Sequence, residues 1–165
     1  MRRAYLVLFG CILQVGVSTA VEASIPTGQM SVTLTLQAEC RLTSVSNLAF
    51  GTSGVIQSAI NGTSVIGVQC TNTTPYDVGL SAGTGPGATV TNRKMAAGAG
   101  GATINYQLFR DSAHTQVWGD NISSNTESGI GNGSIQTLTV YGVVPAQTTP
   151  AAGNYTDTVQ VTITY

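Results

Sequence analysis

Charged side chains and histidine are scarce in this chain of 165 residues, which has six basic residues, seven acidic residues and one histidine. A nucleic-acid partner is not expected, because binding phosphate backbones requires clustered Lys and Arg. One histidine and a few scattered carboxylates also form neither a metal cluster nor an evident pair of catalytic acid and base. We therefore expect no cofactor and no enzymatic activity.

The single histidine, His114, is the only candidate for a catalytic base, and Asp111 and Ser112 lie close to it in the sequence. A hydrolase needs a nucleophile, a base and a group that orients the base. Residues so close in a short turn rarely reach that geometry, so we interpret His114 as a solvated residue between strands. The Gly-rich segments 98–102 and 129–133 lack the Lys and the following helix of a phosphate-binding loop, so we interpret them as flexible turns.

Residues 1–23 have the pattern of a secretory signal peptide. Two arginines precede an apolar run over residues 4–17, and small residues follow, so cleavage after Ala20 or Ala23 is expected. The run is shorter than the roughly 20 apolar residues that a spanning helix needs, so we expect no membrane span after cleavage. An uncleaved membrane anchor and lipidation at Cys11 are the alternatives.

Cleavage would leave four basic and six acidic side chains, a formal charge of −2, and two cysteines, Cys40 and Cys70. In an exported chain an isolated pair of cysteines most simply forms one disulfide. Such a bond would close a loop of about 30 residues and stabilise the fold by about 3 kcal/mol through the unfolded state. Two free thiols, or two ligands of a metal site, are the alternatives.

Two segments show the clearest alternation of apolar and polar residues, which is typical of β-strands. The apolar face of the first segment consists of Met30, Val32, Leu34 and Leu36. The apolar face of the second segment, residues 154–165, consists of Tyr155, Val159, Val161, Ile163 and Tyr165. Threonines occupy most of the opposite face of the second segment.

The chain between these segments predicts further short strands. They are expected at residues 47–51, 63–70, 76–83, 103–111, 116–120 and 135–144. We expect strands 63–70 and 76–83 to form a hairpin. Residues 84–102, which include Arg93 and Lys94, are interpreted as an exposed excursion, and residues 121–134 as a loop. Six or seven strands at this spacing favour one immunoglobulin-like antiparallel β-sandwich.

An ordered set of segments resembles the spore coat protein U domain family, which includes the secreted subunits of archaic chaperone–usher pili. The segments are CRLTSVSNLAFGT, VQCTNTTPYDVGLSAG, RKM, INYQLFRD, WGD and LTVYGVVPAQTTPAAGNYTDTVQVTITY. The resemblance extends from about residue 28 to residue 165. No single segment is diagnostic, but the ordered set is specific.

The resemblance implies an incomplete sandwich whose missing strand is supplied by the N-terminal segment of a neighbouring subunit. Residues 24–38 would be the donor segment, which inserts Met30, Val32, Leu34 and Leu36, and residues 39–165 the pilin domain. The groove that receives a donor would be bordered by Val159, Val161, Ile163 and Tyr165. Implied partners are identical or related subunits, a periplasmic chaperone and an outer-membrane usher. Export to the cell surface and a role in adhesion and biofilm formation are also implied.

Burial of the four donor side chains would contribute about 1.5–3 kcal/mol each and about 6–10 kcal/mol together, similar to the stability of a typical domain. A subunit without a donor should therefore be only marginally stable. Two other interpretations remain open. Residues 28–36 could be the domain's own first strand, or the chain could be a self-contained coat or lectin-like module with residues 83–101 as its recognition loop.

Overall fold

The computed structural model describes residues 16, 18, 20–98 and 101–165. The chain divides into two units, Met1–Thr35 and Leu36–Tyr165. Most of the predicted signal peptide lies outside the described residues. The described residues of the first unit form no strand. The four predicted donor side chains, Met30, Val32, Leu34 and Leu36, are 81% to 86% exposed.

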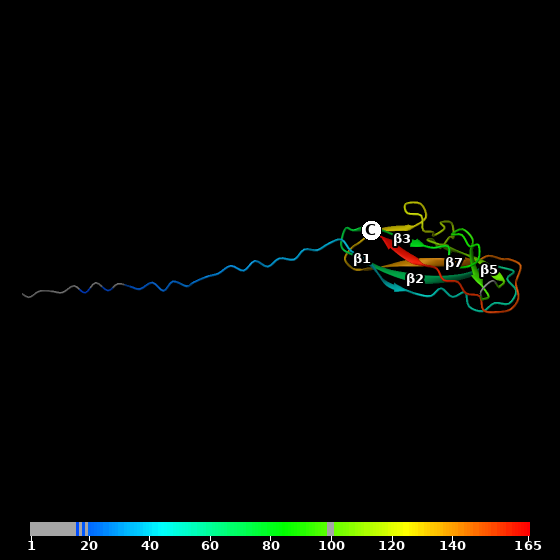
Figure 1. Cartoon of the computed structure of the whole chain (residues 1–165), viewed down its shortest axis with the longest axis horizontal. Helices are drawn as coiled ribbons and strands as arrows, with labels where there is room; N and C mark the ends of the chain where they lie inside the picture. The colour runs from blue at the N-terminus through cyan, green and yellow to red at the C-terminus, as the bar shows by residue number, and fades with distance from the viewer. Residues whose placement is uncertain (1–15, 17, 19, 99–100) are drawn as a thin grey trace, which may run out of the picture. The chain divides into compact units, whose positions relative to one another are not determined.

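The second unit is an all-β sandwich of two antiparallel sheets, which confirms the predicted fold class. A five-stranded sheet has the order β1-β2-β7-β5-β4, and a three-stranded sheet has the order β6-β3-β8 (Figure 1). The strands are β1 (Cys40–Val45), β2 (Ile60–Cys70), β3 (Pro75–Leu80), β4 (Arg93–Ala96), β5 (Thr103–Phe109), β6 (Glu127–Ile130), β7 (Ile135–Val144) and β8 (Val161–Thr164). Within the described part of the chain, no helix has the length and apolar character that a membrane span requires.

The long strands β2 and β7 form the centre of the larger sheet. Their pairing runs without a break from Ile60 opposite Val144 to Gln69 opposite Ile135. Alternate residues of β2, such as Ile66 and Val68, are buried, as the period of two predicts. The β2–β7 pair therefore forms the inner surface on which the rest of the core packs.

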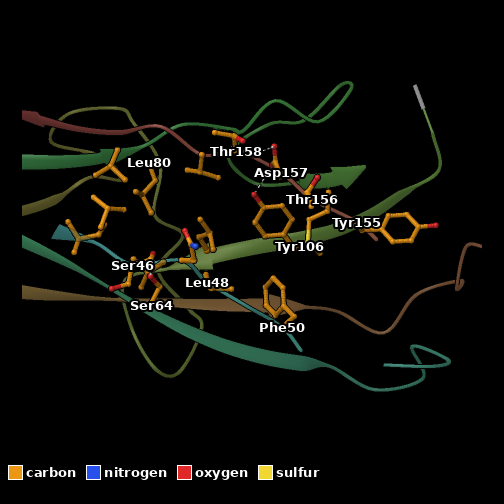
Figure 2. Close-up of a pocket in the computed structure, with 18 residues that line it drawn as sticks. Ser46, Leu48, Phe50, Ser64, Leu80, Tyr106, Tyr155, Thr156, Asp157 and Thr158 are labelled. Carbon is orange, nitrogen blue, oxygen red and sulfur yellow. Dashed lines mark hydrogen bonds between the residues drawn. The ribbon is translucent and has the colours of Figure 1, made fainter. Parts of the chain in front are cut away.

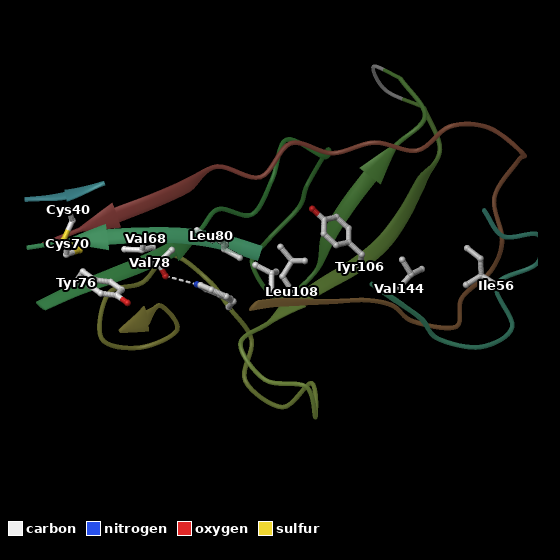
Figure 3. Close-up of a cluster of buried hydrophobic side chains, with 13 residues drawn as sticks. Cys40, Ile56, Val68, Cys70, Tyr76, Val78, Leu80, Tyr106, Leu108 and Val144 are labelled. Atoms are coloured by element: carbon white, nitrogen blue, oxygen red, sulfur yellow. Dashed lines mark hydrogen bonds between the residues drawn. A yellow bond between two sulfur atoms is a disulfide. The ribbon is translucent and has the colours of Figure 1, made fainter. Parts of the chain in front are cut away.

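The hydrophobic core extends along the whole sandwich, as Figure 3 shows. Cys40 and Cys70 lie at one end, here called the disulfide end, and Ile56 and Val144 lie at the other, here called the far end. Between them Trp118 is buried, and its indole N–H donates to the carbonyl of Val78 at 2.7 Å. This hydrogen bond satisfies the polar atom that burial of an indole would otherwise leave unpaired.

The predicted hairpin between strands 63–70 and 76–83 is wrong. Its two strands are β2 and β3, and they belong to different sheets. One side of β2 pairs with β1 and the other with β7, so β3 has no free edge of β2 to join. The turn after Cys70 instead carries the chain across the sandwich to the second sheet.

Residues 84–102 are also not simply an exposed excursion, because they contain β4. Arg93 at the start of β4 is fully buried. Its guanidinium donates hydrogen bonds to four backbone carbonyls, those of Leu80, Ser81, Val90 and Trp118, at 2.7 to 2.9 Å. Burial lowers the pKa of Arg93 because desolvation disfavours its charged form.

The predicted loop over residues 121–134 contains β6, which pairs with β3. Asp77 of β3 accepts hydrogen bonds from the hydroxyls of Thr126 and Ser128, at 2.8 and 2.6 Å. The segments 47–51 and 116–120 were expected to be strands and are not. Residues 116–120 contribute one isolated bridge, Val117 opposite Phe109, and residues 47–51 contribute none among the described residues.

Candidate functional site

The disulfide predicted between Cys40 and Cys70 is present and joins the first residue of β1 to the last residue of β2. The pairing of these strands continues one step beyond it. Thr71 donates its backbone N–H to the carbonyl of Glu39 at 2.9 Å, and its hydroxyl accepts from the N–H of Glu39 at 3.1 Å. The direction of the chain on either side of the disulfide is therefore fixed from Glu39 onward.

β1 and β8 are outer strands of the two sheets and contact each other, and on that side of the sandwich their outer edges have no partner among the described residues. β1 pairs with β2 on one side only, and β8 pairs with β3 on one side only. The two strands run in opposite directions, since Cys40 and Thr164 both lie toward the disulfide end. Unpaired N–H and C=O groups on such edges are a template for an additional strand.

A hollow of about 470 Å³ opens into the core between these edges. One wall consists of the end of β1 and the residues after it, Val45 to Leu48 and Phe50. The other consists of residues 155–159 and the first residue of β8, Val161 (Figure 2). The floor is apolar and consists of Ile66, Leu80, Leu108 and Val140 with the ring of Tyr106. We call this hollow the edge groove.

The edge groove continues toward the far end into a second hollow of about 980 Å³. Both hollows are lined by Leu48, Phe50, Met95, Tyr155 and Thr156. The second hollow adds Ile60, Ile104 and Val144, so its floor is also apolar. The core is therefore accessible along a large part of the open edge.

Two glycines shape the wall that follows β1. Gly62 and Gly142 face each other across β2 and β7, and the side chains of Leu48 and Phe50 lie against them. A Cβ atom at Gly142 would lie 2.8 Å from Leu48 Cδ1, which is too close for a real contact. Residues 47–51 thus form no strand, yet their apolar side chains reach the core because two glycines leave room.

The wall that leads into β8 has the predicted alternation. From Tyr155 to Thr164, odd-numbered residues are half-buried and even-numbered residues are exposed. Val159 and Val161 line the edge groove, and Ile163 packs against the core. Tyr165 differs from its predicted place on the apolar face, because it is 59% exposed and lies past the last pair of β3 and β8.

Asp157 is the exception in this alternation, and it was missed in the analysis of the sequence. It occupies an inward position between Tyr155 and Val159 and lines the edge groove. Its Oδ2 accepts a hydrogen bond from the hydroxyl of Tyr106 at 2.7 Å, drawn in Figure 2. Burial and this hydrogen bond raise the pKa of Tyr106, so its hydroxyl stays protonated and donates. The sequence does indicate this residue, because Asp157 is acidic at a position where the alternation of the segment predicts an apolar side chain.

Within the part of the chain that the structure describes, the His114 side chain contacts no candidate catalytic partner. Its ring packs edge-on against Phe109, with ring centroids 5.3 Å apart, and lies 6.4 Å from the ring of Tyr141. The carboxylate of Asp111 accepts hydrogen bonds from Thr115 and Gln116. Among the described residues, no group of three or more His, Cys, Asp or Glu side chains could hold a metal ion.

The fold and the edge groove together define a class of protein, an immunoglobulin-like antiparallel β-sandwich that is open along one edge. The chain belongs to the Spore Coat Protein U domain family, whose sequence profile matches residues 26–162. It is similar to Protein U of Myxococcus xanthus, with 34% identity over 128 residues that cover 72% of this chain and 71% of that protein.

The chain is also similar to a chain in a solved complex. This is the crystal structure of the CsuC–CsuE chaperone–tip adhesion subunit pre-assembly complex from archaic chaperone-usher Csu pili of Acinetobacter baumannii. The TM-score is 0.57 and the sequence identity is 27%. The match covers 79% of this chain but only 40% of the matched chain, so this chain spans less than half the length of that relative.

Proposed function

We propose that this protein is a structural subunit of a surface pilus assembled by the chaperone–usher pathway through donor-strand complementation. One observation carries the proposal. The same chain has an apolar groove between two unpaired strand edges and an exposed segment with an apolar face, Met30 to Leu36. Each feature alone would promote aggregation in solution, and the groove of one copy of the chain suits the segment of a second copy.

The donor segment has the chemistry that the edge groove requires. Its inward side chains are aliphatic or Met, and the groove floor and the β8 wall present Ile66, Leu80, Val159 and Val161. A strand in this position would also pair with the open backbone edges, which combines hydrogen bonding with apolar burial. Residues 24–38 are the proposed donor, and residues 39–165 are the proposed acceptor domain.

The positions of the strand ends determine which kind of assembly each donor direction would produce. Suppose the donor lies antiparallel to β8; then Leu36 reaches the far end of the acceptor groove. The donor's own domain begins at Cys40, at its disulfide end, so the disulfide end of one subunit meets the far end of the next. This contact is heterologous, it leaves a donor and a groove free at the two ends, and it generates an open fibre.

The opposite direction has a different outcome. A donor parallel to β8 would bring two disulfide ends together, with both grooves and both donors at one contact. Two copies could then exchange segments reciprocally and close a dimer with two-fold symmetry. A donor antiparallel to β8 would be parallel to β1, because these two strands run in opposite directions. Of β1 only Val45 lines the edge groove, whereas residues 155–159 and Val161 all line it, so β8 and the residues before it offer the longer edge. We therefore favour a donor that pairs with β8 in the antiparallel direction that all strand pairs of the sandwich share, and hence the fibre.

The similarity to the Csu complex supports a periplasmic chaperone as the partner that covers the edge groove before assembly. An outer-membrane usher, cleavage of residues 1–23, and export through the periplasm to the cell surface belong to the same proposal. Adhesion and biofilm formation are the proposed roles of the assembled pilus, and the domain acts by assembly and not by catalysis.

Electrophoresis of the exported protein without boiling tests the proposal. The unchanged chain should run as a ladder that collapses to one band on heating. Leu34→Asp should abolish the ladder, because a carboxylate on the inserted face is buried without a partner at a cost of several kcal/mol. Thr35→Asp carries the same charge on the opposite face of the strand and should retain the ladder.

Three results would contradict the proposal. A single unheated band for the unchanged chain would indicate a self-contained module, and a discrete dimer would indicate reciprocal exchange. A ladder that survives Leu34→Asp would show that another contact joins the subunits.

A further inference from the structure

The wall of the edge groove just before β8 is not held in place by regular strand pairing. Thr156 exchanges backbone hydrogen bonds with Ala96 of β4, and regular pairing with β3 begins at Val161. Residues 157–160 lie between these points, and no strand pair includes them. Even so, they are part of the edge on which an incoming strand would pair.

The loop over residues 81–84 supplies the missing contacts. Ser81 donates its backbone N–H to the carbonyl of Gln160 at 3.0 Å, and its hydroxyl accepts from the N–H of Gln160 at 2.9 Å. Thr84 donates both its backbone N–H and its hydroxyl to Asp157 Oδ1, at 2.7 and 3.0 Å. The loop therefore forms hydrogen bonds with both ends of the 157–160 segment.

The Asp157 carboxylate links three parts of the fold. Oδ1 also accepts from the N–H of Thr158 at 2.7 Å, while Oδ2 accepts from Tyr106 of β5. The carboxylate approaches the loop at Gly83, which has φ +86°. A Cβ atom at Gly83 would collide with Asp157 Oδ2, so a glycine is needed both for the backbone conformation and for the close approach.

Buried Arg93 fixes the loop from the other side. Its guanidinium donates to the carbonyls of Leu80 and Ser81, and to that of Trp118 in the core. The loop that grips residues 157–160 is thus itself anchored to the interior. A valine at position 157 would complete the apolar alternation, but it would leave the Tyr106 hydroxyl and the Thr84 N–H without this acceptor.

We propose that Asp157 is a positioning residue for strand acceptance, which holds residues 157–160 extended so that the edge groove stays open and its edge can pair with a donor strand. This inference rests on the proposed function and goes beyond it. The carboxylate does not recognise the donor through its charge. It acts through Thr84 and Tyr106, so its effect depends on its acceptor atoms.

Dissociation of a donor peptide from the full chain tests this role. The chain carries Leu34→Asp, which prevents its own N-terminal segment from acting as a donor. It is refolded with a fluorescent peptide of residues 24–38. The complex is isolated, excess unlabelled peptide is added, and release is followed by fluorescence anisotropy. Asp157→Ala should release the peptide at least about tenfold faster, equivalent to about 1.4 kcal/mol. Asp157→Asn keeps an acceptor oxygen and should release it within about threefold of the Leu34→Asp rate.

Asp111→Ala is the matched control. Asp111 also accepts several hydrogen bonds, from Thr115 and Gln116, but it lies outside the edge groove, so its loss should leave peptide release unchanged. Thermal unfolding of each complex, followed by Trp118 fluorescence, separates positioning from general stability. A lower melting temperature with unchanged peptide release would overturn the inference.

The remaining outcomes are also decisive. If the Leu34→Asp chain forms no complex with the peptide, the proposed function fails and the inference fails with it. If that chain binds and Asp157→Ala releases the peptide at the same rate, only the inference fails. Should Asp157→Ala not fold, Tyr106→Phe removes one donor to the carboxylate with little change of shape. Faster peptide release from Tyr106→Phe would support the inference, and unchanged release would overturn it.

Discussion

Arg93 and Asp157 show how a chain with few charges uses two of them inside the fold. Arg93 joins three separate segments through their carbonyls, and Asp157 joins three through their donors. Arg93 and Asp157 do not form a direct ion pair with each other. Backbone and hydroxyl dipoles stabilise both the buried guanidinium of Arg93 and the half-buried carboxylate of Asp157, which is the condition for tolerating such groups away from water.

Replacing Arg93 by Lys should destabilise the domain by about 2–4 kcal/mol, although the positive charge is kept. An ammonium group presents its donors from one atom and cannot reach carbonyls that the planar guanidinium spans. Each buried carbonyl left unpaired costs about 1–3 kcal/mol. Urea unfolding of the peptide-bound chain, followed by Trp118 fluorescence, measures the loss. Arg41→Lys, at an exposed residue that bonds Gln69, is the control and should change stability by less than about 0.5 kcal/mol. If Arg93→Lys were as stable as Arg41→Lys, the guanidinium of Arg93 would not be needed for stability.

These interior roles could not be predicted from the sequence. Arg93 and Lys94 are neighbours of the same charge in a Gly-rich stretch, and such a pair usually indicates a solvated loop. The carbonyls that bind Arg93 come from residues 80, 81, 90 and 118, which only the folded chain brings together. Asp157 did leave a local signal, because it interrupts an apolar face.

At the scale of elements, β8 and the residues before it should tolerate charge on one face only. Val161→Asp places a carboxylate on the half-buried face that lines the edge groove, and it should abolish accumulation of the exported protein. Thr162→Lys changes the adjacent, exposed residue and should accumulate nearly normally. Immunoblots of periplasmic and surface fractions measure both. Similar accumulation of the two variants would refute the assignment of faces.

Strand faces could be predicted because they depend on local alternation, whereas strand partners could not. β5 and β7 were expected almost at their observed bounds, and inward Tyr106, Leu108 and Val140 follow the period of two. β6 was missed because four residues with Gly and Ser resemble a loop until β3 lies beside them. The open edge itself was expected only through the family resemblance, since alternation does not reveal which strand is absent.

At the scale of the whole molecule, a segment that fits a neighbour's groove must not fill its own. A donor that folded back beside β1 in the same molecule would need a reversal just before Cys40. In the tightest hairpin that keeps Leu36 and Leu34 facing inward, Leu36 lies opposite Cys40, because a shift of one residue would turn every apolar side chain outward. The loop would then consist of Gln37, Ala38 and Glu39.

That loop is poorly suited to a reversal. Three-residue hairpin loops usually need a residue in the left-handed region, most often Gly, and these three positions contain neither Gly nor Asn. Glu39 is also engaged through its N–H and its carbonyl with Thr71, in the direction of β1. Folding back would break both hydrogen bonds. The chain around the disulfide thus favours donation to another molecule.

Inserting Asn-Gly between Ala38 and Glu39 should therefore convert the polymer into a self-filled monomer. The loop would become Ala38-Asn-Gly, with Gly available for the left-handed position, while Glu39 keeps its bonds to Thr71 and Leu36 still faces Cys40. Inserting Ala-Ala at the same place adds equal length without that conformational freedom, and it should leave the ladder in unheated electrophoresis intact. The Asn-Gly chain should instead run as one compact band that resists unfolding, because its groove is filled from within. A persistent ladder for the Asn-Gly chain would show that the turn before Cys40 does not direct the donor outward. Loss of the ladder in both chains would show that the length of the linker, and not its turn, decides which groove the segment fills.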